Sequence, residues 1–213
     1  MDGVTVENVS LTLRRATILN DVSAQFPQGT ITGIVGNNGS GKSMLLKCVC
    51  GFIRPDRGKI TVFGKDYLAL KQFPQSMGFI IEAPGFLPEL SGIDNLMMLS
   101  RIRNRIGSAE VRAAMEQVGL NPAEKKSVKK YSMGMKQRLG IAQAIMENPI
   151  LLLLDEPMNG LDSGGVHEMR VLFQRLCDLG KTLVLTSHNR EDIDILCSRV
   201  YQMDGGRCRL CAP

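Results

Sequence analysis

Residues 36–43 constrain the fold of this chain more than any other segment, because their sequence GNNGSGKS fits the phosphate-loop pattern G-x-x-x-x-G-K-[ST]. Glycines let the backbone turn tightly and point successive N–H groups at an anion. Residues 31–35 before the loop predict a buried strand, and residues 43–49 after it predict a helix whose positive end faces the phosphates. The segment therefore predicts a site for a nucleoside triphosphate. A glycine-rich turn that fits the pattern by accident is the alternative.

Two side chains at the end of the loop carry specific chemistry. Lys42 can reach the β- and γ-phosphates, and the hydroxyl of Ser43 can bind Mg²⁺. The residues predicted to bind the nucleotide are Gly36, Asn37, Asn38, Gly39, Ser40, Gly41, Lys42, Ser43 and Met44.

Hydrophobic patterning around the loop predicts an α/β fold. Residues 4–35 alternate in the manner of strands, whereas residues 89–147 have helical spacing. Residues 150–154 and 181–187 are largely apolar runs, with a helix expected around 167–179 between them. Continuous apolar strands alternating with helices indicate a parallel sheet that is covered on both faces.

We therefore expect a single domain over residues 1–213. Its core would be a phosphate-loop NTPase fold with a mainly parallel sheet and an N-terminal antiparallel β part, formed by residues 1–82 and 148–213. A helical subdomain at about residues 83–147 would be inserted into this core.

Composition and charge argue against several other classes of protein. The chain has no run of 18 or more uncharged apolar residues, and residues 1–7 resemble no signal peptide, so we expect a cytosolic protein. The net charge of +5 is mild, and the basic cluster at residues 125–130 lacks interleaved aromatics, so we expect no nucleic-acid partner. The six cysteines predict reduced thiols, and the pair Cys208 and Cys211 is only half a zinc site.

Polar side chains follow the two apolar runs and predict the catalytic groups. Asp155 and Glu156 would lie at the carboxyl edge of the sheet, where such folds bind ligands. Asp155 is the expected Mg²⁺ partner beside Ser43, and Glu156 can accept a proton from an attacking water. His188 follows the next strand and could hold that water or a γ-phosphate oxygen in place. The alternatives are a helix-capping Asp-Glu pair and a merely polar strand end.

Residues 131–139 predict a second anion site, because Ser132 and Gly134 open a helix just before the strand that ends in Asp155. One nucleotide does not need two separate helix N-termini. We therefore expect this site to serve the nucleotide of a second copy of the protein.

Together these motifs resemble the nucleotide-binding subunit of an ATP-binding cassette (ABC) transporter, along the whole chain. They occur in family order: the phosphate loop at residues 36–43, the signature loop at 132–137, the Walker B segment at 151–156, the D-loop at Leu161 and Asp162, and the switch histidine at His188.

The resemblance implies a head-to-tail dimer, with a homodimer expected, that encloses two molecules of ATP. In that dimer the signature loop binds ATP in trans, with Ser132 and Gly134 on the γ-phosphate and Met133 and Met135 beside them, while Asp162 lies at the dimer contact. The resemblance also implies integral membrane permease subunits, which would hold the chain at the inner face of the cell membrane.

Several positions depart from the commonest family pattern. Residues 131–137 read YSMGMKQ where LSGGQ is usual, while Asn37 replaces a Pro and Met44 a Thr. Residues 13–16 lack the aromatic residue that stacks on adenine in the family, and an Arg guanidinium could stack there instead.

Glu82 is the most informative departure, because most of the family has Gln there, touching Mg²⁺ and linking hydrolysis to the membrane subunit. With the sequence that follows it, Glu82 resembles the bacitracin- and lantibiotic-immunity branch of exporters. A Glu can still offer an oxygen to Mg²⁺ but adds a negative charge beside Asp155 and Glu156. We expect it to bind metal and to couple the site to the partner interface; a surface Glu at a strand end is the alternative.

The leading hypothesis is thus an ATP-hydrolysing subunit of an ABC exporter, with antimicrobial-peptide export or immunity as a further hypothesis. A soluble ABC ATPase that acts on ribosomes or nucleic acid is the alternative from another class, but such relatives typically carry two cassettes or a long insert. A nucleoside kinase that shares only the phosphate loop would leave the signature loop unexplained.

Overall fold

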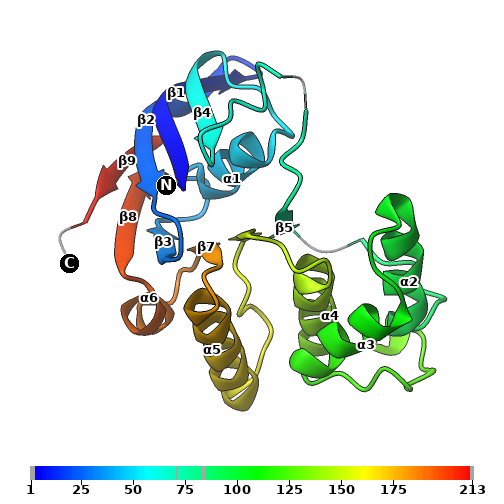
Figure 1. Ribbon diagram of the computed structural model, residues 1–213. Helices are drawn as coiled ribbons and strands as arrows, with labels where there is room; N and C mark the ends of the chain where they lie inside the picture. Colours follow the sequence, from blue (N-terminus) through cyan, green and yellow to red (C-terminus); the bar gives the residue numbers. More distant parts are fainter. Residues whose placement is uncertain (1–2, 71, 83–84, 212–213) are drawn as a thin grey trace.

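A mixed six-stranded sheet organises the residues that the computed structural model describes, which are 3–70, 72–82 and 85–211 (Figure 1). Its strand order is β5-β6-β7-β3-β8-β9. The first five strands pair in parallel, and β9 pairs antiparallel with β8. The strands are β5 (Met77–Ile80), β6 (Leu151–Leu154), β7 (Thr182–Thr186), β3 (Ile31–Val35), β8 (Arg199–Asp204) and β9 (Arg207–Leu210).

Strand β6 shows why the apolar runs predict a doubly covered sheet. Leu152 and Leu154 pack into the core that the helices share, whereas Leu151 and Leu153 pack into the core on the opposite face. Successive side chains of a strand point to opposite faces, so only an unbroken apolar run can fill both cores. The α/β prediction is confirmed.

A second, antiparallel sheet lies over one face of the first, with strand order β2-β1-β4 (Figure 1). Its strands are β1 (Val4–Leu13), β2 (Ala16–Phe26) and β4 (Arg57–Val62). Helix α1 (Lys42–Cys50) packs into the core between the two sheets through Leu45, Leu46 and Val49. The phosphate loop is thus anchored at both ends in buried structure.

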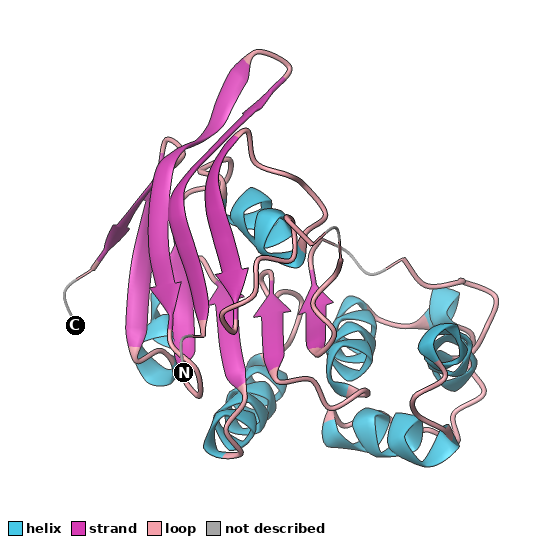
Figure 2. Ribbon diagram, turned by 45° about the horizontal axis from the view of Figure 1, so that its top comes forward, coloured by secondary structure: helices cyan, strands magenta, loops and turns pink. Residues whose placement is uncertain are grey.

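Helices α2 (Gly92–Arg103), α3 (Ser108–Gln117) and α4 (Met133–Ile145) lie together beside the β5 edge of the sheet, with a short 3₁₀ turn at Val128–Lys130 (Figures 1 and 2). α4 packs directly on β5. The division into a core and an insert that begins at about residue 83 stays a proposal, and Ala83 and Pro84 lie outside the described residues.

Helices α5 (Ser163–Asp178) and α6 (Arg190–Leu196) cover the remaining part of the helical face. The helix expected around residues 167–179 begins earlier, at Ser163, because the side chain of Asp162 caps it by accepting a hydrogen bond from the Gly165 N–H.

Within the described part of the chain, no helix has both the length and the apolar character needed to cross a bilayer.

Candidate active site

The phosphate loop joins β3 to α1, and its geometry depends on glycine at two positions. A methyl group on Gly36 would lie 2.2 Å from the carbonyl oxygen of Met203 in β8, so no other side chain fits there. Gly41 has φ 106° and precedes α1 without any side-chain cap. The first N–H groups of α1 therefore have no capping side chain to compete with an anion.

Lys42, the first residue of α1, is held inside the loop. Its side chain is only 6% exposed, and its ammonium donates hydrogen bonds to the carbonyl oxygens of Gly36 at 2.7 Å and Asn37 at 3.2 Å. A buried ammonium fixed in this way places a positive charge where the loop would receive a phosphate.

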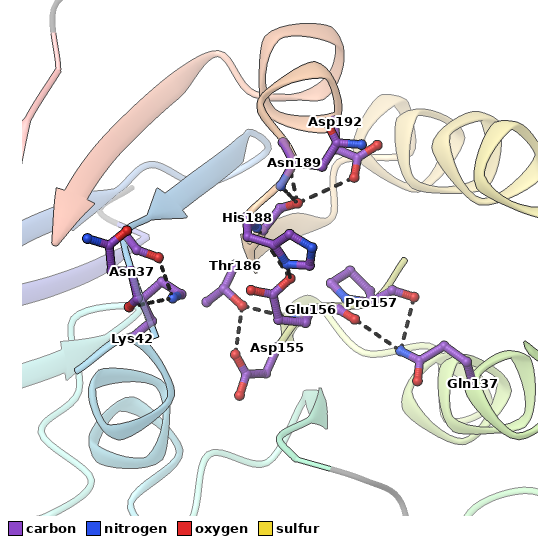
Figure 3. Close-up of polar contacts among 12 residues, drawn as sticks. Asn37, Lys42, Gln137, Asp155, Glu156, Pro157, Thr186, His188, Asn189 and Asp192 are labelled. Atoms are coloured by element: carbon purple, nitrogen blue, oxygen red, sulfur yellow. Dashed lines mark hydrogen bonds and ion pairs between the residues drawn. The ribbon is translucent and has the colours of Figure 1, made fainter. Parts of the chain in front are cut away.

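Asp155 and Glu156 follow β6 at the same edge of the sheet. The hydroxyl of Thr186, the last residue of β7, donates to Asp155 Oδ1 at 2.6 Å and accepts from the Glu156 N–H at 2.9 Å (Figure 3). Glu156 itself has φ 49°, in the left-handed region that few side chains adopt. Sequence reasoning missed Thr186, because it ends an otherwise apolar strand.

His188 lies at the same edge of the sheet as Glu156, and the two side chains are in direct contact. The Nδ1 atom of His188 lies 2.9 Å from Glu156 Oε2, and the His188 N–H donates to the same oxygen at 3.3 Å (Figure 3). The imidazole is largely exposed, with 65% of its side-chain surface accessible. The carboxylate and the ring therefore form a pair at the open side of the site.

A buried ion pair supports the loop that carries His188. Asp192 is 2% exposed; its Oδ1 accepts from Arg170 Nε at 2.9 Å, and its Oδ2 accepts from the hydroxyl of Ser187 at 3.3 Å. Hydrogen bonds to Glu191 and Asp192 raise the pKa of Arg170. Sequence reasoning missed this pair, because charged residues on helices usually face solvent.

Glu82 lies just beyond β5, and its carboxylate pairs with the ammonium of Lys47 on α1 at 2.5 Å. Its φ is 64°, and 67% of its side chain is exposed. Its predicted roles in metal binding and coupling stay predictions. Sequence reasoning missed Lys47 as its partner.

The second predicted anion site lies at the start of α4. Ser132 caps the helix by accepting from the Met135 N–H at 3.2 Å, and Ser132 and Met133 are exposed while Gly134 is half-buried. Gln137 Nε2 donates to the carbonyl oxygens of Glu156 at 3.3 Å and Pro157 at 3.0 Å (Figure 3). This end of α4 is thus tied to the segment that follows β6.

The region before the phosphate loop contains the predicted turn. Arg14 and Arg15 have φ values of 49° and 69° at the β1–β2 turn, and both side chains are exposed. Ile18 of β2 is the residue of this region that lines the pocket beside the loop. The stacking of an Arg on adenine stays a prediction, and the contribution of Ile18 was missed.

A pocket of about 290 Å³ brings the main predicted residues together. It is lined by Ile18, Asn38, Gly39, Gly41, Lys42, Ser43, Met44, Asp155 and Glu156.

The donors in this pocket fit Mg²⁺, which prefers few protein oxygen ligands together with water and phosphate. Ser43 offers a hydroxyl and Asp155 a carboxylate. Among the residues that the structure describes, no group of three or more His, Cys, Asp or Glu could enclose a metal on its own. The set therefore suits a metal that arrives with a phosphate ligand.

A protein-family model described as "ABC transporter" matches residues 19–159 of the chain. The matched segment contains the phosphate loop, the start of α4 and the two carboxylates after β6.

Three curated relatives are similar over most of the chain. An uncharacterized ABC transporter ATP-binding protein, YybJ of Bacillus subtilis, is 40% identical over 96% of this chain and 94% of its own length. The bacitracin transport ATP-binding protein BcrA of Enterococcus faecalis is 37% identical over 95% of this chain and 67% of its own. The lantibiotic transport ATP-binding protein SrtF of Streptococcus pyogenes is 33% identical over 90% of this chain and 82% of its own length.

Among solved structures, the dimeric bacterial ABC transporter cassette MJ0796 superposes with a TM-score of 0.87 at 21% sequence identity. The match covers 99% of both chains, so the two proteins share one fold.

Proposed function

The chain belongs to the ABC transporter family and is an ATPase of that family, and we propose that it drives an exporter through separate membrane permease subunits. The observation that carries the ATP-hydrolysing part of the proposal is the convergence of Lys42, Asp155 and Glu156 on one pocket, with His188 against Glu156, while the transport part rests on the relatives. These groups supply phosphate binding, a metal ligand and a base at one sheet edge.

The proposed chemistry assigns each group a role in ATP hydrolysis. The N–H groups of the loop and the ammonium of Lys42 bind the phosphates. Glu156 accepts a proton from the attacking water, and His188, held by the same carboxylate, orients that water and the γ-phosphate. Mg²⁺ held by Ser43 and Asp155 would neutralise phosphate charge.

The signature loop supports a head-to-tail dimer. Ser132 and Met133 are exposed at the start of α4, next to half-buried Gly134 and Met135, and could meet the γ-phosphate of a second subunit. Asp162, which is exposed as the cap of α5, would lie at the same contact. Each ATP would then be enclosed by the phosphate loop of one copy and the signature loop of the other.

The names of two relatives support antimicrobial peptides as the class of transported substrate. BcrA and SrtF are named for the transport of bacitracin and of a lantibiotic. We infer that this chain serves an antimicrobial-peptide exporter, attached to the inner face of the membrane through its permease. The alternative of an ATPase acting on ribosomes or nucleic acid gains no support from these relatives.

The substitution Glu156→Gln tests the catalytic assignment, with Glu116→Gln on the exposed face of α3 as the matched control. We expect Glu156→Gln to bind ATP normally, to lower kcat by about 100-fold or more, and to accumulate as an ATP-bound dimer in size-exclusion chromatography. Wild-type turnover in Glu156→Gln would overturn the assignment of the base.

Glu82 is proposed to exchange Lys47 for Mg²⁺ and so to link metal occupancy to the permease interface. The substitution Glu82→Gln should change the Mg²⁺ dependence of hydrolysis and reduce transport with the permease, whereas Glu89→Gln, which alters another exposed ion-paired Glu, should change neither. Unchanged Mg²⁺ dependence together with unchanged transport in Glu82→Gln would contradict this role.

A further inference from the structure

We propose that Thr186 is a positioning residue for hydrolysis, whose hydroxyl orients both the metal-binding carboxylate of Asp155 and the backbone of the base Glu156. The inference rests on the proposed function, because it takes those two roles as given. It concerns a residue outside every motif that the sequence singled out.

The hydrogen bonds of Thr186 have only one consistent direction. A hydroxyl has one proton to donate and lone pairs to accept with, whereas a backbone N–H can only donate. Because the Glu156 N–H donates to Thr186 Oγ1 at 2.9 Å, the hydroxyl proton is available for Asp155 Oδ1, which lies 2.6 Å away. One carboxylate oxygen of Asp155 is thereby engaged, and the other is left for a ligand in the pocket.

The second bond acts on the conformation of Glu156. A left-handed backbone at a residue with a side chain persists only where its surroundings hold it. The N–H of Glu156 is held by Thr186, and its carbonyl oxygen accepts from Gln137 Nε2 at 3.3 Å. Bonds on both sides of the residue thus keep the backbone turned so that the carboxylate reaches His188.

The place of Thr186 in the sheet explains how one hydroxyl can serve both groups. Strand β7 lies between β6, which leads to Asp155, and β3, which leads to the phosphate loop. Thr186 pairs in register with Ile34, two residues before Gly36. Its side chain therefore lies between the metal-binding carboxylate and the strand that carries the loop (Figure 3).

A buried hydroxyl destabilises the folded protein unless it forms hydrogen bonds. Thr186 is 0% exposed, and among the described residues its hydroxyl forms hydrogen bonds with Asp155 and Glu156. A valine of the same shape would fill the strand end without a polar atom to satisfy. The hydroxyl is thus satisfied by the two groups that perform the chemistry.

The test compares Thr186→Val, which keeps shape and removes the hydroxyl, with Thr186→Ser, which keeps the hydroxyl. Thr182→Val is the matched control, because Thr182 begins the same strand, is equally buried, and accepts a hydrogen bond from the Gly29 N–H instead. The readouts are kcat and KM for ATP, the Mg²⁺ concentration that half-saturates binding of a fluorescent ATP analogue, and the thermal unfolding midpoint.

We expect Thr186→Val to lower kcat by about 10- to 100-fold while KM changes by less than about threefold, because misplaced catalytic groups affect the chemical step. Its half-saturating Mg²⁺ concentration should rise several-fold, and Thr186→Ser should restore most of both quantities. Thr182→Val should lower the unfolding midpoint without changing kcat.

Wild-type kcat in Thr186→Val would overturn the inference, and so would a Thr186→Ser variant as slow as Thr186→Val. A loss of kcat with unchanged Mg²⁺ dependence would overturn the part that concerns Asp155. If Thr186→Val does not fold, Thr186→Ala replaces it, and equal kcat values for Ala and Ser would overturn the inference. An inactive Glu156→Gln beside an active Thr186→Val defeats this inference alone, whereas an active Glu156→Gln defeats the proposed function.

Discussion

Two helices begin near the carboxyl edge of the sheet, and their first turns are built differently. α1 follows left-handed Gly41 without a side-chain cap and starts with Lys42, which is buried. α4 is capped by its own Ser132, and the next residue, Met133, is 66% exposed. One helix start is enclosed by its own chain, and the other is open to solvent.

The two helix starts therefore suit different roles in nucleotide binding. The start of α1 shares a pocket with Asp155 and Glu156, so a single chain brings together the groups that we propose for phosphate binding, metal binding and base catalysis. The start of α4 contacts the segment after β6 through Gln137, whose Nε2 donates to the carbonyl oxygens of Glu156 and Pro157. This difference supports the proposal that α1 forms one side of an ATP site and that the start of α4 contacts the ATP of another copy.

Removing the charge at α1 should have the largest effect. The substitution Lys42→Ala is expected to weaken ATP binding by about 100-fold or more, because charge-assisted hydrogen bonds to phosphate are lost. Lys136→Ala, in the first turn of α4, removes a matched exposed charge and should leave binding by the monomer unchanged. Isothermal titration calorimetry measures the dissociation constant of each variant for ATP. Equal losses would erase the distinction between the two helix starts.

Mixing two inactive variants tests whether the α4 start serves another chain. Gly134→Asp would place a carboxylate at the proposed γ-phosphate contact, and Lys42→Ala disables the phosphate loop. A mixed dimer has one site in which both sides are intact, so mixing should restore up to about a quarter of the wild-type ATPase rate. Steady-state hydrolysis of the mixture is the measurement. No recovery at any mixing ratio would contradict the shared site.

Loss of the ion pair between Arg170 and Asp192, which supports the loop with His188, should have the next largest effect, on stability. Asp192→Ala removes the buried carboxylate that bonds Arg170, which keeps its exposed partner Glu191, and we expect a loss of about 2 kcal/mol in the free energy of unfolding. The matched control is Asp194→Ala, whose pair with Arg190 is 3.9 Å long and exposed, and which should be neutral. Denaturant unfolding measures both. A neutral Asp192→Ala would show that the loop does not need this support.

Cys48, in the last turn of α1, should give the smallest effect, a change in how the free energy of unfolding depends on pH. Helix α4 contains no cysteine and should show no such effect. Burial, and then the charge of Asp56, raise the pKa of Cys48 from 9.0 to about 12. The unfolded thiol ionises first as the pH rises, so the stability from this group is complete below pH 9 and is lost from there toward pH 12. Between pH 9 and 10 the loss is about 1 kcal/mol.

Cys48→Ala should show a smaller fall in unfolding free energy than wild type over that interval, whatever its stability at pH 8. Parallel pH curves for the two proteins would refute the assignment of this titration to Cys48.

Local patterns predicted the elements that carry the site. The loop at residues 36–43, the apolar strand before Asp155 and the paired position of His188 are readable because each depends on neighbouring residues. Ser132 and Gly134 at the start of a helix predicted a second anion site, and this role stays a prediction. The α/β fold followed from the same runs, since strands buried on both faces must be apolar throughout.

Contacts between distant segments were not readable in this way. The partner of Glu82 is Lys47, 35 residues earlier, and this pairing depends on where β5 lies relative to α1. Thr186 looks like the end of an apolar strand until β6 is placed beside β7. Arg170 and Asp192 look like surface charges until α5 and α6 pack together. In each case the decisive information is the order of strands and helices in space.

The close approach of Gly36 to Met203 has a consequence for the synthesis of the protein. Strand β3 lies between β7 and β8, which are synthesised after it, and the Gly206 N–H also donates to the carbonyl oxygen of Ser40. A nascent chain that has emerged as far as residue 198 carries the whole phosphate-loop sequence but lacks the strand that shapes it. At about 5 to 20 residues per second, β8 is completed about ten to thirty seconds after the loop, and we expect the loop to bind ATP only after that interval.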